Sequence, residues 1–125
     1  MTARNSLLLI AGMFIFIITT MPVHADKTGV TIEAPESVKK GQSAVIRITI
    51  THKGNNFMHH TNWVYVKADG KEIARWEFSP GKLPENEVFT RDVNMTVTGP
   101  VEITAEGNCN LHGGRGAVTK KIAVK

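Results

Sequence analysis

The sequence predicts an all-β protein, a sandwich of two antiparallel sheets, on the strength of three observations. Apolar side chains recur at every second position in one segment after another, which is the period of a half-buried strand. From Asp26 onward we find no apolar stripe with the spacing of an amphipathic helix. Turns containing Gly, Pro and Asn separate the alternating segments. About seven short strands in about 100 residues are typical of an immunoglobulin-like sandwich.

The first four expected strands follow from this alternation. A short strand covers residues 30–32, and the clearest one covers residues 44–51, whose even-numbered positions are all apolar. Residues 63–68 and 72–78 also alternate, and they flank Asp69-Gly70, a dipeptide favoured in two-residue hairpin turns. We therefore expect the third and fourth strands to pair as a hairpin.

Three further strands complete the expected domain. Residues 89–97 alternate in the same way, and Gly99-Pro100 ends that strand. Residues 101–105 and 117–124 form the last two. We find no internal repeat and no linker, so we expect one domain over residues 26–125.

Residues 1–25 have the three parts of a secretory signal peptide. Arg4 precedes the uncharged apolar run 7–21, and Val23-His24-Ala25 supplies the small residues of a cleavage site. A retained membrane anchor is the alternative, but the run is shorter than the ~20 residues that a spanning helix needs. We expect an exported, periplasmic protein that has no membrane attachment after cleavage.

Charge and cysteine content exclude two classes of protein. The formal net charge is +4, and the basic residues are interspersed with acidic ones in clusters no larger than the pairs Lys39-Lys40 and Lys120-Lys121. This pattern argues against a nucleic-acid partner. The single cysteine, Cys109, excludes a disulfide framework within the chain.

The leftover thiol has histidines near it in the expected fold. His112 follows Cys109 by three residues, and His52 and His59 lie in the connection between two expected strands. Loops of a sandwich gather at its two ends, so these four side chains can meet at one end. Thiolate and imidazole are suitable ligands for iron, copper or zinc. The sequence therefore predicts a metal site made of these four residues.

The neighbouring residues receive structural interpretations. His60 is expected to point away from the site that His59 faces, either supporting a ligand or lying on the surface. Gly107 is expected to relax the backbone of the turn around Cys109. The aromatic residues expected in the core are Trp63, Tyr65 and Trp76. The alternative for the whole cluster is a set of solvated histidines beside a buried, inert thiol.

The same residues resemble the catalytic domain of the superoxide reductase family, also known as neelaredoxin and desulfoferrodoxin. Residues 109–113 match its Cys-Asn-x-His-Gly ligand loop, and residues 59–64 look like its His-(His/Tyr)-x-x-Trp-Ile segment. Residues 26–33 are similar to its Glu-Lys-His-Val-Pro-Val-Ile-Glu segment, and His52 corresponds to its upstream histidine ligand. The resemblance implies a mononuclear non-haem iron and reduction of superoxide to hydrogen peroxide, with electrons from an unidentified donor protein. It also implies a catalytic role for Lys27, whose charge would attract the anionic substrate.

The sequence departs from the family where a ligand is expected. The family's first histidine aligns with Thr28, and Lys53 follows His52 where the family has proline. A site with one imidazole fewer suits copper or zinc as well as iron. Two alternatives therefore stand: a copper-binding or electron-transfer protein with a cupredoxin-like site, and a non-enzymatic binding module that uses Cys109 as a thiol. The sequence leaves open whether the chain forms a homo-oligomer.

Overall fold

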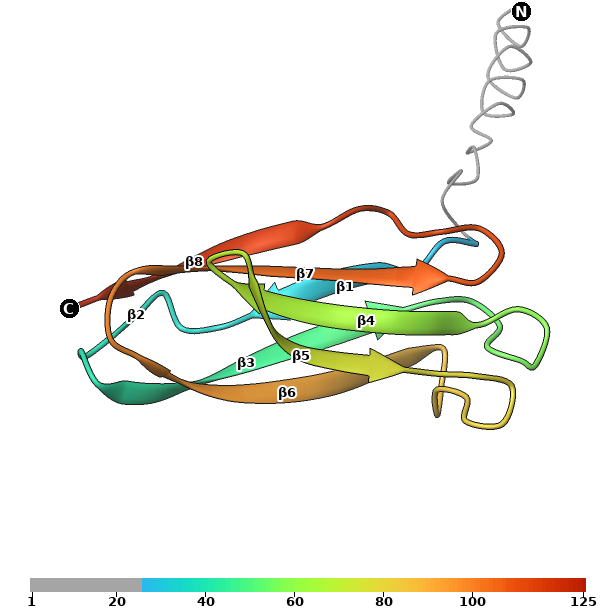
Figure 1. Cartoon of the computed structure of the whole chain (residues 1–125), viewed down its shortest axis with the longest axis horizontal. Helices are drawn as coiled ribbons and strands as arrows, with labels where there is room; N and C mark the ends of the chain where they lie inside the picture. The colour runs from blue at the N-terminus through green and yellow to red at the C-terminus, as the bar shows by residue number, and fades with distance from the viewer. Residues whose placement is uncertain (1–25) are drawn as a thin grey trace, which may run out of the picture.

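A computed structural model describes residues 26–125, so the expected signal peptide lies outside the described residues. These residues form eight strands in two sheets (Figure 1). The strands are β1 (Gly29–Glu33), β2 (Ser37–Val38), β3 (Gln42–Thr51), β4 (Thr61–Ala68), β5 (Lys71–Glu77), β6 (Val88–Val97), β7 (Val101–Cys109) and β8 (Val118–Val124). The order is β1-β3-β6 in the smaller sheet and β2-β8-β7-β4-β5 in the larger. The predicted all-β sandwich is confirmed.

The hydrophobic core lies between the two sheets. Buried and exposed positions alternate along most of β3, and the same alternation along β7 turns a second apolar row toward it. The largest fully buried apolar side chains are Ile46, Ile48, Ile50, Ile103 and Ile122. Full burial of such a side chain stabilises the fold by about 1.5–3 kcal/mol. Within residues 26–125, no helix is long and apolar enough to cross a membrane.

Two strands differ from the sequence prediction. The two-residue strand β2 was not predicted, because it is too short for alternation to be visible, and it pairs in parallel with β8. Strand β7 runs on to Cys109, past the residue 105 at which we expected it to end, because residues 106–109 also pair with β4. Cys109 is thus the last residue of a strand and does not lie in a loop.

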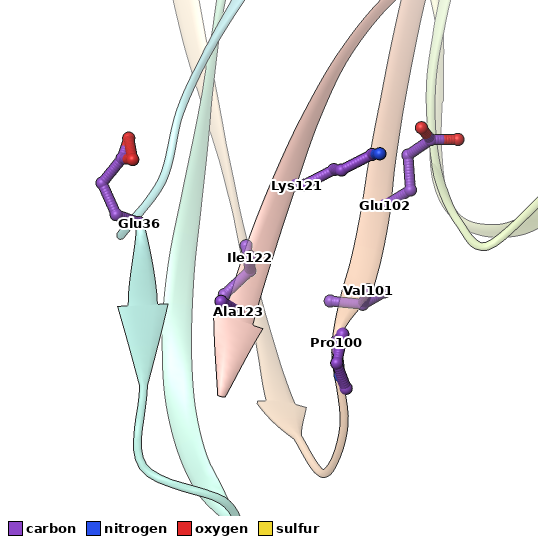
Figure 2. Close-up of a pocket in the computed structure, with 7 residues that line it drawn as sticks. All are labelled: Glu36, Pro100, Val101, Glu102, Lys121, Ile122 and Ala123. Carbon is purple, nitrogen blue, oxygen red and sulfur yellow. The ribbon is translucent and has the colours of Figure 1, made fainter. Parts of the chain in front are cut away.

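The two ends of the sandwich differ in chemistry. The β3–β4, β5–β6 and β7–β8 connections and the start of β1 lie at one end, on the right in Figure 1. The predicted Asp69-Gly70 hairpin turn joins β4 to β5 toward the other end. There, a shallow hollow of about 520 Å³ lies beside the start of β7 at Val101, and neither histidine nor cysteine lines it (Figure 2). The four histidines within residues 26–125 and Cys109 therefore gather at the end where β1 begins.

Candidate metal centre

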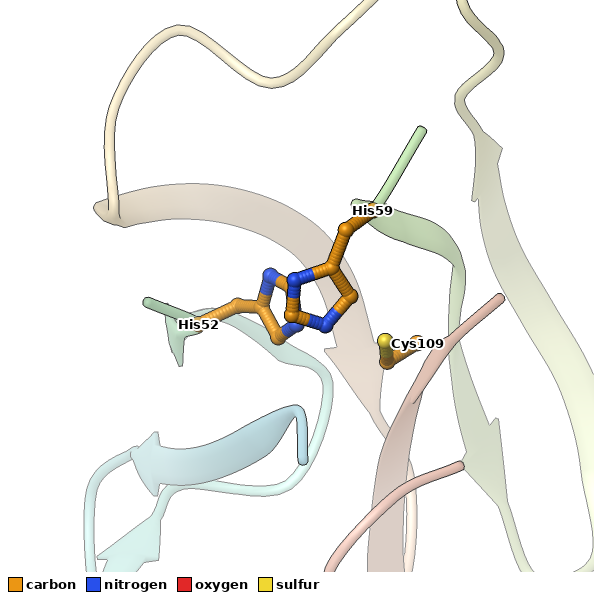
Figure 3. A group of neighbouring side chains, drawn as sticks. All are labelled: His52, His59 and Cys109. Atoms are coloured by element: carbon orange, nitrogen blue, oxygen red, sulfur yellow. The ribbon is translucent and has the colours of Figure 1, made fainter. Parts of the chain in front are cut away.

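Three side chains from three separate segments converge at this end. The potential ligand atoms of His52, His59 and Cys109 all lie within 4.8 Å of one another (Figure 3). His52 directly follows β3, His59 lies in the β3–β4 connection, and Cys109 ends β7. Antiparallel pairing of Thr61 with Cys109 places the β3–β4 connection beside the sulfur. Three of the four predicted donors thus form one compact group.

His52 is buried with one ring nitrogen satisfied and the other unpaired. Its side chain is 1% exposed, and its Nδ1 lies 2.9 Å from Asn55 Oδ1. That oxygen also accepts the backbone N–H of Thr61, while the Asn55 amide nitrogen donates to the carbonyl of Asn86. Because Oδ1 can only accept, Nδ1 carries the proton and Nε2 presents a lone pair.

The free nitrogen of His52 is the most informative atom of the site. Nε2 is buried and has no hydrogen-bond partner within the described part of the chain. Burial lowers the pKa of His52, because the imidazolium would lose its hydration, although the Asn55 hydrogen bond acts in the opposite direction. A neutral imidazole with one nitrogen oriented by an amide and the other directed at neighbouring donors is the arrangement of a metal ligand.

Cys109 is buried, and two backbone N–H groups point at its sulfur. The side chain is 1% exposed, and the amides of Leu111 and His112 each donate to Sγ at 3.4 Å. The turn is closed by reciprocal backbone hydrogen bonds between Cys109 and Gly113, whose φ of 78° suits glycine. The local fold therefore directs partial positive charge toward the sulfur, which favours a thiolate ligand.

His112 lies at the exposed side of the group. Its Nδ1 is 3.0 Å from His59 Nε2 and 3.9 Å from Cys109 Sγ. The rings of His59 and His112 meet edge to face at 4.8 Å, and His52 meets His59 similarly at 4.6 Å. The fourth predicted donor thus contacts two of the other three, although it lies outside the compact group of three.

Asparagine side chains hold the β3–β4 connection in shape and join it to the β7–β8 connection. Asn110 Oδ1 accepts the backbone N–H of His60, and its amide nitrogen donates to the carbonyl of Met58. Asn56 Oδ1 accepts the backbone N–H groups of Met58 and His59. Sequence reasoning missed the roles of these asparagines and of Asn55. Their only sequence signal is their frequency in both loops.

Thr28, which aligns with the family's first histidine, is buried and hydrogen-bonded to another threonine. Thr28 is 1% exposed, and its hydroxyl lies 2.8 Å from that of Thr61, which is fully buried. A Cβ atom built on Gly107 would lie 2.7 Å from the Thr28 methyl group. Our interpretation of Gly107 as a turn residue was therefore wrong, because it lies within β7 and makes room for Thr28.

Other residues near the site only partly match expectation. His60 is 4% exposed, with Nδ1 3.0 Å from the Asn56 carbonyl, so it supports the loop and does not lie on the surface. Trp76 packs against the core as expected. Trp63 and Tyr65 do not, because they stack on each other outside the core cluster. Lys27 is partly buried one residue before Thr28, at the same end as the donors.

The donor set fits a transition metal. Two imidazoles and a thiolate are borderline and soft donors that suit iron, copper or zinc, and His112 can complete a fourth position. The unpaired, buried Nε2 of His52 is costly unless something binds it. A metal ion at the centre of the group would satisfy that atom.

The fold and the donor set together define a β-sandwich domain with a candidate mononuclear metal centre at one end. The family profile described as desulfoferrodoxin matches residues 21–114, and the chain belongs to this family. A search of curated proteins found no match.

Solved structures agree with this assignment. Superoxide reductase (neelaredoxin) from Ignicoccus hospitalis is 27% identical, with a TM-score of 0.62 over 79% of this chain and 83% of that one. A variant of the same protein is 27% identical, with a TM-score of 0.64 over 81% of this chain and 83% of that one. A Thermotoga maritima protein provisionally named a superoxide reductase is 27% identical, with a TM-score of 0.59 over 86% of this chain and 94% of that one. The family uses non-haem iron, and the chain is similar to its members over most of its length.

Proposed function

We propose that this chain is an exported mononuclear non-haem iron protein that reduces superoxide to hydrogen peroxide. His52, His59 and His112 would supply imidazole ligands, and Cys109 would supply the thiolate. The observation that carries the proposal is the unpaired, buried Nε2 of His52 beside the Cys109 sulfur, in a chain of the desulfoferrodoxin family. Ferrous iron, when bound, supplies the single electron that superoxide needs, and two protons complete hydrogen peroxide.

The protein's own residues would have distinct tasks. Asn55 would hold the His52 ring through its Nδ1 proton and so leave Nε2 free to bind the metal. The backbone N–H groups of Leu111 and His112 stabilise negative charge on the Cys109 sulfur. Lys27, at the same end, would attract the superoxide anion through the field of its ammonium group. His112 is exposed, so superoxide and the donor protein would approach from its side.

The experiment is to load the purified protein with iron and follow superoxide decay after pulse radiolysis, while measuring hydrogen peroxide and oxygen. The proposal requires hydrogen peroxide without the oxygen that dismutation would release. Cys109→Ala should abolish the thiolate-to-iron absorption band and the reaction. Leu111→Ala is the matched control, since that side chain is 62% exposed and its backbone N–H remains. An unchanged band in Cys109→Ala would refute the assigned ligand.

Copper is the second candidate, since His52, His59 and Cys109 are the two imidazoles and one thiolate of blue-copper sites. Zinc also accepts four such ligands. Metal analysis and visible spectroscopy of protein isolated without added metal distinguish ferric thiolate, cupric thiolate and a colourless zinc site. If the chain is instead a thiol-based binding module, its binding activity should survive a strong chelator.

Export is a separate part of the proposal. The N-terminal sequence of residues 1–25 supports a signal peptide that is cleaved after Ala25. The intact mass of protein recovered from a cell envelope fraction should then correspond to a chain beginning at Asp26. A full-length mass in the membrane fraction would favour the retained anchor.

A further inference from the structure

The outer face of the larger sheet carries an aromatic pair that the core does not use. Trp63 and Tyr65 lie two residues apart on β4, with ring centroids 5.6 Å apart and planes inclined by only 12°. Both side chains are partly buried. On the neighbouring strand β7, Trp63 is paired with Asn108 and Tyr65 with Glu106. Tyr65 is the only tyrosine of the chain.

Tyr65 has a proton acceptor in place. Its hydroxyl donates to Glu106 Oε1 at 2.6 Å, a short hydrogen bond to a carboxylate. This bond raises the pKa of Tyr65 to about 12, with a smaller contribution from burial. The phenol therefore stays protonated at neutral pH, and its proton lies directly beside a base.

Cations above the rings determine which oxidised form they can hold. The Arg75 guanidinium lies 5.5 Å from the Trp63 ring and 5.7 Å from the Tyr65 ring, and Lys67 Nζ lies 4.7 Å from the Tyr65 ring. Positive charge at these positions stabilises the neutral rings and opposes a radical cation. A phenol avoids that charge by releasing its proton when it loses an electron, and Tyr65 has Glu106 to accept that proton.

The pair begins next to the candidate metal centre. Trp63 is paired with Asn108, the residue directly before Cys109. Cα atoms of directly opposed residues in an antiparallel pair lie about 4.5–5.5 Å apart. Asn108 also donates to Asn62 Oδ1 at 2.8 Å, which ties the two strands together at this point. The aromatic pair thus leads from the strand end that carries the sulfur along the outer face of the sheet.

We propose that Trp63 and Tyr65 form a one-electron relay that draws oxidising equivalents away from the metal centre. The relay rests on the proposed function, because the oxidising equivalents would come from hydrogen peroxide that reacts again at the iron-loaded site. Reduction of hydrogen peroxide to two water molecules takes two protons and two electrons, one from ferrous iron and one from Trp63, which becomes a radical cation. Because Arg75 destabilises that cation, its oxidation passes on to Tyr65. Tyr65 then reduces Trp63 by one electron while the phenolic proton moves to Glu106 Oε1. A small thiol or ascorbate-like reductant returns one electron to Tyr65, and the proton returns from Glu106.

The test does not require catalysis. Azide radicals generated by pulse radiolysis oxidise the tryptophans of the purified protein, and absorbance then follows decay of the tryptophanyl radical and growth of the tyrosyl radical. In Trp76→Phe, which leaves Trp63 as the only tryptophan, the tyrosyl radical should form in a first-order process whose rate constant is independent of protein concentration. In Trp63→Phe the tyrosyl radical should form more slowly by at least an order of magnitude. Trp76 is the matched control because it lies on the adjacent strand β5 but packs against the core.

Equal rates in the two tryptophan variants would overturn the relay, whether or not the protein reduces superoxide. Glu106→Gln should slow tyrosyl formation, since the amide is a poor proton acceptor, and an unchanged rate would show that Glu106 has no part in it. In iron-loaded protein exposed to hydrogen peroxide, Tyr65→Phe should increase oxidation of Cys109, measured by mass spectrometry. Equal Cys109 oxidation in wild type and variant would contradict the protective role.

Discussion

The hydroxyl groups of Thr28 and Thr61 lie 2.8 Å apart in the protein interior, and Thr61 is paired across the sheet with Cys109. They join the start of β1 to the start of β4, two strands that belong to different sheets. Neither side chain is accessible to water, so each hydroxyl depends on the other. Thr28 stands where the resemblance to the superoxide reductase family would put a histidine.

Removal of either hydroxyl should therefore be costly, and removal of both should not. We expect Thr28→Val to lower the free energy of unfolding by about 1–3 kcal/mol, because the Thr61 hydroxyl is left buried and unpaired. Thr61→Val should behave alike, and the double variant should be close to wild type because valine has nearly the same shape. Urea denaturation of all four proteins gives the coupling energy. Additive losses would show that the two hydroxyls do not depend on each other.

Asn55 should control metal affinity through His52. Asn55→Ala removes the acceptor of the His52 Nδ1 proton and frees the ring to rotate. We expect affinity to fall about 10- to 100-fold, as for other residues that orient a metal-bound histidine. Competition with a coloured chelator measures the loss. Asn94→Ala, at an exposed position on β6, is the control and should bind metal like the wild type.

The only tyrosine should ionise unusually late. The Glu106 hydrogen bond raises the pKa of Tyr65 to about 12, so the phenolate absorbance should appear well above the usual pH of about 10. Glu106→Gln should shift the midpoint down toward 10. Because the folded-state pKa is raised, the associated stability is complete below pH 10 and is lost as pH rises toward 12. A wild-type midpoint near 10 would mean that the hydrogen bond does not persist in solution.

Gly114 should tolerate no side chain. A Cβ atom built there collides with the backbone carbonyl oxygen of Gly107, so Gly114→Ala must push the β7–β8 connection away from β7. We expect the free energy of unfolding to fall by about 1–3 kcal/mol or more. Metal binding should weaken as well, because His112 lies in that connection and Cys109 directly precedes it. Gly81→Ala, where the added carbon meets nothing within 4 Å, should leave the midpoint of thermal unfolding nearly unchanged.

The fold was accessible to sequence reasoning because its strands are long and alternate regularly. Strand ends then fix where loops gather, which explains why the sequence alone groups His52, His59, Cys109 and His112. Their roles as ligands remain a prediction. What alternation cannot reveal is how far pairing extends, and Cys109 was placed in a loop because residues 106–109 include a glycine and polar side chains.

A single irregularity explains the misplaced aromatic residues. Pairing between β4 and β7 shifts by one residue between Thr61 and Trp63. A bulge reverses the faces of all residues that follow it, so Thr61 and Val64 point inward while Trp63 points outward. The supporting asparagines escaped notice for a related reason, since a side chain that bonds a loop 50 residues away cannot be recognised before the register is known.

The long sequence separations within the centre also determine when it can form. The contacts between Thr28 and Thr61 and between His59 and His112 join residues 33 and 53 positions apart. Chains dominated by such non-local contacts fold in milliseconds to seconds, because the chain must lose the entropy of closing long loops before the stabilising contacts can form. A nascent chain that ends before β7 (Val101–Cys109) holds only His52 and His59 of the four candidate ligands. On the proposed function, the metal site is therefore complete only after the β3–β4 and β7–β8 connections have met, so a metal ion cannot guide the earliest steps of folding.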